Sequence, residues 1–219
     1  SPLAFSIKNR DHKRWESVFT GDNLGEVTID SDPALKKLNA EVLKPRPGHA
    51  DLVGAMKYGF SNLRPVIERA SARETAARVL AGAVAQILLK ELGIETFSRV
   101  ISIGTAVDNS EYINWDQEVL DNSPLRVLGD PKPMMEEIDK AKASGDSLGG
   151  VVEIKVTGLI PGLGSYVHWD KRLDGQLAGA VMSVPAIKGV EIGSGFNLAK
   201  LPGSKAHDEI GYNDSYYRY

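Results

Sequence analysis

Residues 71–93 read SARETAARVLAGAVAQILLKELG, the clearest secondary-structure pattern in the sequence. Apolar side chains recur three and four residues apart, so this stretch predicts an amphipathic helix with one face toward a core. Ser71 and Glu74 have the spacing of a capping box, in which two side chains bond free backbone N–H groups at a helix start. Gly93 lies where glycine commonly ends a helix. We therefore expect one long helix that begins at Ser71 and ends at Gly93.

Further strands and helices are predicted on both sides of this helix. Apolar alternation and short apolar runs predict strands at residues 2–8, 99–103, 148–157 and 187–192. Helices are expected at residues 32–43, 50–60, 130–144 and 173–182, whereas 193–219 shows little periodicity. This order predicts a mixed α and β protein whose sheets are covered by helices. Because residues 158–188 can return a helix to a neighbouring strand, we expect a single core domain spanning residues 1–219.

Composition narrows the class of protein. Hydrophobic residues make up 42% and charged residues 25% of the 219-residue chain, values typical of soluble globular proteins. No window approaches the ~18 consecutive apolar residues of a membrane helix, and the N-terminus has no signal pattern. The absence of cysteine excludes disulfides, thiol nucleophiles and zinc–thiolate sites. With a net charge of −3, we expect a cytoplasmic protein that binds neither nucleic acid nor membranes.

Basic residues are concentrated in one part of this acidic chain. Residues 44–78 contain seven lysines and arginines against three acidic residues. Such a block indicates a site for an anionic small molecule, although a solvated helix face is an equally good interpretation.

The block begins with the motif RPGHAD at residues 46–51. His49 lies on a loop stiffened by two prolines, and an imidazole there could transfer protons near neutral pH. Arg46 could hold a carboxylate or phosphate through paired hydrogen bonds. Spacing alone favours the other interpretation, in which His49 only bonds backbone, because most histidines are not catalytic.

A second motif, ERASARET at residues 68–75, surrounds the start of the long helix. Free N–H groups and the helix dipole favour an anion at such a start, and Arg69 and Arg73 would strengthen its binding. The alternative is that Ser71 is only a cap, contributing roughly 1 kcal/mol, while the arginines point into solvent.

Other familiar site patterns are missing. Gly162-Leu163-Gly164 and Gly193-Ser194-Gly195 match neither the dinucleotide fingerprint nor the P-loop, so they predict turns. His12, His168 and His207 lack metal-ligand spacing, and we expect no metal site.

Taken in order, the motifs resemble those of the chorismate synthase family. The matching stretches are RPGHAD (46–51), KYG (57–59), ERASARETAAR (68–78), GDSLGG (145–150), GLG (162–164), RLD (172–174) and KGVEIG (188–193). The resemblance runs from about residue 2 to residue 209. It implies an α+β fold with helices packed between antiparallel β-sheets.

The resemblance also implies an activity. Chorismate synthases carry out the anti-1,4-elimination of phosphate from 5-enolpyruvylshikimate-3-phosphate, which gives chorismate for aromatic amino acid biosynthesis. They require reduced FMN although the reaction has no net redox change, and the likeness associates the chain with NADP as well. Family members are homotetramers, so we expect a homo-oligomer.

The resemblance also implies roles for particular residues. His49 matches the catalytic histidine close to the reduced flavin. Arg46, Ser71 and Arg73 match substrate-binding positions. The flavin-binding positions are Arg69, Ala70, Ser71, Pro185 and Ala186; many relatives have asparagine in place of Pro185, so the contact implied there is through backbone.

Family segments beyond this match are missing from the sequence. The Gly-Glu-Ser-His-Gly stretch with a second catalytic histidine is absent, as are a Lys-Pro-containing flavin loop and an Arg-Asp pair. We therefore expect a core truncated at both ends that is inactive alone and binds FMN weakly or not at all. Two alternatives are an assembly module that keeps only oligomer contacts and a generic phosphate-binding α/β protein.

Overall fold

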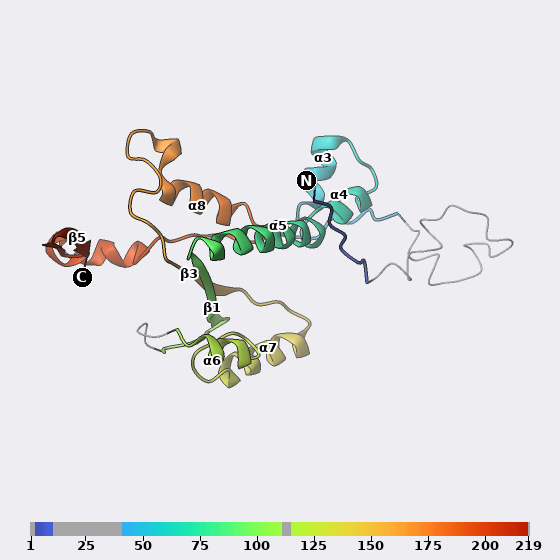
Figure 1. Ribbon diagram of the computed structural model, residues 1–219. Coiled ribbons are helices and arrows are strands. Elements are labelled where there is room, and N and C mark those ends of the chain that lie inside the picture. Colours follow the sequence, from blue (N-terminus) through green and yellow to red (C-terminus); the bar gives the residue numbers. More distant parts are fainter. Residues whose placement is uncertain (1–2, 11–40, 111–114, 219) are drawn as a thin grey trace. The chain divides into compact units, whose positions relative to one another are not determined.

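The computed structural model describes residues 3–10, 41–110 and 115–218 (Figure 1). The chain divides into two compact units, Ser1–Glu74 and Thr75–Tyr219, and the division falls inside the helix α5 (Ala72–Glu91). Helices and antiparallel sheets are both present, so the predicted α+β class is confirmed. Each unit is described separately below.

The first unit is built on two short helices, α3 (Asp51–Tyr58) and α4 (Arg64–Arg69). They approach closely, because a Cβ on Gly54 would lie only 2.5 Å from Cγ1 of Val66. Ala55, Leu63 and Val66 are buried. The predicted helix at 50–60 is confirmed by α3, whereas α4 was not predicted.

Two residues separate α4 from α5. Ala70 is extended, and Ser71 has a left-handed φ of 57°. A capping serine normally has an extended backbone, so the capping-box prediction is wrong in its geometry. The long helix itself is confirmed, and so is its end: Gly93 has φ 74°, and Ile94 N–H donates to the Leu89 carbonyl at 2.9 Å.

The second unit contains a three-stranded antiparallel sheet. Its strands are β1 (Glu95–Ile103), β2 (Ala106–Val107) and β3 (Gly150–Thr157), in the order β2-β1-β3. The predicted strands at 99–103 and 148–157 are confirmed, and β1 begins earlier than expected. At the end of β3, a Cβ on Gly158 would lie 2.0 Å from the Gly93 carbonyl oxygen, so only glycine fits there.

Two helices, α6 (Gln117–Asn122) and α7 (Lys132–Ser144), accompany this sheet, and α7 contacts β1 and β2 (Figure 1). Leu120, Val127 and Met134 are almost completely buried and form its small core. The helix at 130–144 was predicted; α6 was not.

The C-terminal residues add short elements to the second unit. They are η1 (Trp169–Lys171), α8 (Leu173–Met182), η2 (Gly195–Lys200), α9 (Gly203–Ala206) and the hairpin of β4 (Ile210–Asn213) and β5 (Ser215–Arg218). The helix α8 has the predicted bounds. The hairpin was not predicted.

Two predicted strands are wrong. Residues 187–192 and the described residues 3–9 have no strand structure. Leu3, Phe5 and Ile7 alternate as in a strand but are more than half exposed. Alternation describes a strand only when a neighbouring strand supplies hydrogen bonds. Most of the predicted helix at 32–43 lies outside the described residues.

Many apolar side chains of the described residues are exposed to solvent. The helix α5 has no buried residue, and Val79, Ile87 and Leu88 on it are about two-thirds exposed. None of the helices in the described part of the chain combines the length and apolar character that crossing a bilayer requires.

Candidate functional site

The predicted histidine loop is a turn that leads directly into α3. The backbone N–H of His49 donates to the Arg46 carbonyl at 3.4 Å, and Gly48 takes a φ of 70° that glycine tolerates easily. The prediction of a defined loop here is confirmed. The turn therefore holds His49 at a fixed place just before the helix.

A bidentate ion pair fixes the beginning of this turn. Arg46 donates from Nε to Asp51 Oδ2 at 2.8 Å and from Nη2 to Oδ1 at 3.0 Å. The Arg46 backbone N–H donates to Oδ2 as well, at 3.0 Å. Hydrogen bonds from Arg46 lower the pKa of Asp51 to about 2, against a usual 3.8. The same pair raises the pKa of the Arg46 guanidinium.

This pairing limits how Arg46 could bind an anion. A guanidinium has two forks of parallel donors, and Asp51 occupies the one formed by Nε and Nη2. The fork formed by Nη1 and the second Nη2 hydrogen has no partner among the described residues, and the side chain is 46% exposed. Arg46 can therefore hold a carboxylate or phosphate while still paired with Asp51.

The His49 ring is held through one nitrogen. Nδ1 lies 2.9 Å from the Pro47 carbonyl oxygen. A carbonyl only accepts hydrogen bonds, so Nδ1 of the neutral ring carries the hydrogen and Nε2 is the acceptor nitrogen. The backbone contact expected from the simpler interpretation is present, and it is compatible with proton transfer because it orients the ring.

The second motif forms its own ion pairs at the α4–α5 junction. Glu68 Oε2 lies 2.6 Å from Arg73 Nη2, and Glu68 Oε1 lies 4.0 Å from Arg64 Nη1. Arg69, Ser71 and Arg73 are exposed. Arg73 is therefore held across the junction by Glu68, a residue for which the sequence alone predicted no role.

Backbone strain coincides with two of the predicted flavin positions. Positive φ occurs at four non-glycine positions of the described chain, namely Ser71 (57°), Arg126 (55°), Ala186 (74°) and Asp214 (56°). Each such residue costs of order 1–3 kcal/mol, and such strain concentrates at functional sites. Two of these four strained positions are thus candidate ligand contacts.

Pro185 lies in a tight turn in which proline is a favoured residue. Ile187 N–H donates to the Val184 carbonyl at 3.2 Å, closing a four-residue turn. Proline suits the second position of a turn, and a positive φ at the third is typical of type II. Ala186 therefore adopts a conformation that usually selects glycine, while Pro185 stiffens the residue before it.

The predicted residues fall in different units. Arg46, His49 and Asp51 lie together, and Arg73 lies against Glu68, all in the first unit; Pro185 and Ala186 belong to the second. The packing of α3 on α4 at Gly54 and Val66 connects the two motifs of the first unit. That the turn at His49 and the junction at Ser71 line one anion cavity stays a prediction.

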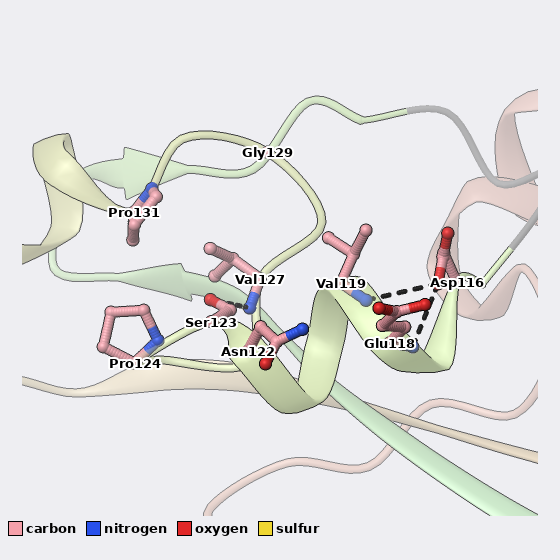
Figure 2. A pocket seen from close by; sticks show the side chains of 9 residues that line it. All are labelled: Asp116, Glu118, Val119, Asn122, Ser123, Pro124, Val127, Gly129 and Pro131. Atoms are coloured by element: carbon pink, nitrogen blue, oxygen red, sulfur yellow. Dashed lines mark hydrogen bonds between the residues drawn. The ribbon is translucent and has the colours of Figure 1, made fainter.

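A cavity of about 470 Å³ lies elsewhere, between α6 and the segment that precedes α7 (Figure 2). Figure 2 shows Asp116 accepting from the N–H groups of Glu118 (2.9 Å) and Val119 (3.2 Å) and so capping α6. The lining contains two carboxylates and no basic side chain, so it does not suit an anionic ligand. Among the described residues, no cluster of three potential metal ligands occurs.

Comparison with known proteins identifies the class. A sequence model described as chorismate synthase matches residues 1–218. The chorismate synthase of Saccharopolyspora erythraea is 50% identical over 95% of this chain and 52% of its own length. Chorismate synthase 2 of Bacillus thuringiensis is 49% identical over 96% of this chain and 54% of its own length.

A solved structure agrees with these sequences. A crystal structure of chorismate synthase matches with a TM-score of 0.71 and 45% identity, over 77% of this chain and 55% of that one. The chain belongs to the chorismate synthase family. It spans about half the length of the curated relatives it matches.

Proposed function

We propose that this chain contributes to the chorismate synthase reaction, the FMN-dependent anti-1,4-elimination of phosphate from 5-enolpyruvylshikimate-3-phosphate. Membership of a family of lyases supports the reaction class. The observation that carries the proposal is the fixed turn at His49, whose Nδ1 is bound to the Pro47 carbonyl, which leaves Nε2 as the acceptor nitrogen of the neutral ring.

The residues present fit an anionic cofactor and substrate. Arg69 and Arg73 are exposed at the junction of two helices, and Ser71 and Ala186 have the strained backbone that ligand sites often contain. By the family likeness, Arg69, Ala70 and Ser71 are proposed flavin contacts in the first unit, and Pro185 and Ala186 are proposed flavin contacts in the second. When bound, reduced FMN would lend an electron as phosphate leaves and would recover it afterwards, so that the reaction has no net redox change.

The remaining roles belong to the chain's own charged and polar side chains. The free fork of Arg46, together with Ser71 and Arg73, would bind the substrate's carboxylates and phosphate through charge-assisted hydrogen bonds. His49 would hold a proton at Nε2 for transfer within the site. Glu68 would keep Arg73 beside the junction.

A chimaera tests this function directly. The chain replaces the matching half of the Saccharopolyspora erythraea enzyme, and phosphate release is followed anaerobically with reduced FMN. We expect chorismate formation, and we expect His49→Ala to lower turnover by roughly 10²- to 10⁴-fold, the range usual for a proton-transfer group.

His207→Ala is the matched control, because His207 has no assigned role, and we expect it to leave turnover unchanged. A folded, FMN-binding chimaera in which His49→Ala changes turnover by less than threefold would exclude His49 from the reaction. A folded chimaera that forms no chorismate would contradict the proposed function.

An assembly role is the second candidate, favoured by the bare apolar side chains of α5 and β3. In this case the chain forms homo-oligomers, a tetramer by family likeness, without binding flavin. Light scattering coupled to size exclusion, with flavin titration on the same sample, separates the two. A multimer without FMN affinity supports the assembly role for the chain alone.

A further inference from the structure

Asp51 is the most completely buried charged residue among the described residues of the first unit. It is 0% exposed, although it lies in the first turn of a short surface helix. Burying a carboxylate is costly unless hydrogen bonds and an opposite charge compensate. Here both oxygens are bound, and all three donors belong to Arg46.

The three bonds connect α3 to the residue that opens the histidine turn. Arg46 contributes its backbone N–H and two guanidinium nitrogens to Asp51, and its carbonyl accepts from the His49 N–H. His49 is thus linked to the buried carboxylate through a single residue. The helix that carries Asp51 is in turn fixed on α4 at Gly54 and Val66.

We propose that Asp51 is a positioning residue that fixes the Arg46 guanidinium and the orientation of the His49 ring. This inference rests on the proposed function and adds a residue for which the family likeness implied no role. Asp51 touches neither substrate nor flavin in this scheme. It acts through Arg46, by holding one fork so that the other faces a ligand, and through the turn, by keeping Nδ1 of His49 on the Pro47 carbonyl.

The experiment uses ¹⁵N NMR of the 219-residue chain, whose four histidines can be assigned by substitution. We expect neutral His49 to be in the Nδ1–H form, and the Arg46 Nε–H to give a slowly exchanging signal. In Asp51→Asn we expect mixed His49 tautomers and loss of the Arg46 signal, because the amide keeps the shape but removes the charge and one acceptor.

A second variant and a control make the result decisive. Arg46→Gln removes the same ion pair by changing its exposed partner, so it should also give mixed His49 tautomers. It provides the test in case Asp51→Asn does not fold. Glu153→Gln weakens another ion pair with a buried arginine, Arg99, at 2.7 Å in the second unit, and should leave His49 unchanged. An unchanged Nδ1–H signature in folded Asp51→Asn, or in Arg46→Gln, would overturn the proposal.

Activity in the chimaera gives an independent test. Asp51→Asn should raise KM at least tenfold, and this effect should vanish in an Arg46→Ala background, since Asp51 acts through Arg46. Equal effects in both backgrounds would contradict the inference. The NMR result does not depend on catalysis. If the chimaera is inactive but Asp51→Asn still loses the Nδ1–H form of His49, the proposed function is refuted and the positioning role of Asp51 stands.

Discussion

At the scale of single residues, the site depends on a carboxylate that must stay charged. Asp51 has a folded-state pKa of about 2 against a usual 3.8, because Arg46 donates hydrogen bonds to its charged form. A group with a lowered pKa stabilises the folded state above its unfolded pKa, and this contribution is lost as the pH falls through the folded pKa.

We therefore expect the stability difference between the wild-type chain and Asp51→Asn to shrink as the pH falls from 3.8 toward 2. Urea unfolding at a series of pH values measures it. Asp174→Asn serves as control, since Asp174 also pairs with an arginine but lies at the surface, where ion pairs contribute little. A difference that is constant over this range would show that Asp51 is not held as described.

The strained residue Ala186 gives a second prediction at this scale. Replacing it by glycine removes a Cβ from a left-handed conformation with φ 74°, which costs roughly 1–2 kcal/mol in L-residues. Greater freedom of the unfolded chain offsets part of this gain. We expect Ala186→Gly to raise the melting temperature slightly, whereas Ala178→Gly inside α8 should lower it; a clear loss in Ala186→Gly would contradict the strain.

At the scale of elements, the contact between α3 and α4 holds the two motifs of the first unit. A methyl group at Gly54 would collide with buried Val66 at 2.5 Å. Gly54→Ala should therefore lower the free energy of unfolding by about 1–3 kcal/mol, as overpacking does. Gly82 in α5 has open space around it, so Gly82→Ala should raise that free energy by about 0.5–1 kcal/mol.

Urea unfolding followed by circular dichroism measures both variants. Both variants replace glycine by alanine in a helix. If the free energy of unfolding falls in Gly54→Ala and rises in Gly82→Ala, the difference is due to packing and not to helix propensity. If Gly54→Ala were stabilising like Gly82→Ala, α3 and α4 would not pack as described.

Helices were easier to predict than strands because their evidence is local. The apolar pattern of α5 and α7 and the small residues of α8 are visible in the sequence itself, and Gly93 and Gly145 end α5 and α7 as glycine usually does. The segments at 3–9 and 187–192 have apolar patterns without a hydrogen-bonded neighbour. The helix α4 was missed because its six residues are too few to show a period.

At the scale of the whole molecule, exposed apolar side chains are the dominant feature of the described surface. The strand β3 is an edge of its sheet, and its Ile154 is 58% exposed beside Val152. Unpaired apolar edges associate readily. The chain spans about half the length of the relatives it matches, and nothing in the described part of the chain covers this face.

We therefore expect the isolated chain to self-associate and to bind a hydrophobic dye. Ile154→Lys should reduce both, as followed by light scattering and dye fluorescence. Ala143→Lys adds the same charge at an exposed position of α7 and should have little effect. A monomer without dye binding at high concentration would argue against an exposed association surface.

The sequence by itself determined the family, the α+β class, the long helix with its glycine end, and the identity of the candidate site residues. Only the tertiary structure decided that Asp51 is buried, that it occupies one fork of Arg46, that Glu68 holds Arg73, and that Ser71 and Ala186 are strained. Periodicity and motif order depend on neighbours along the chain. Burial, ion pairing and backbone strain depend on which distant groups meet, and no spacing in the sequence specifies that.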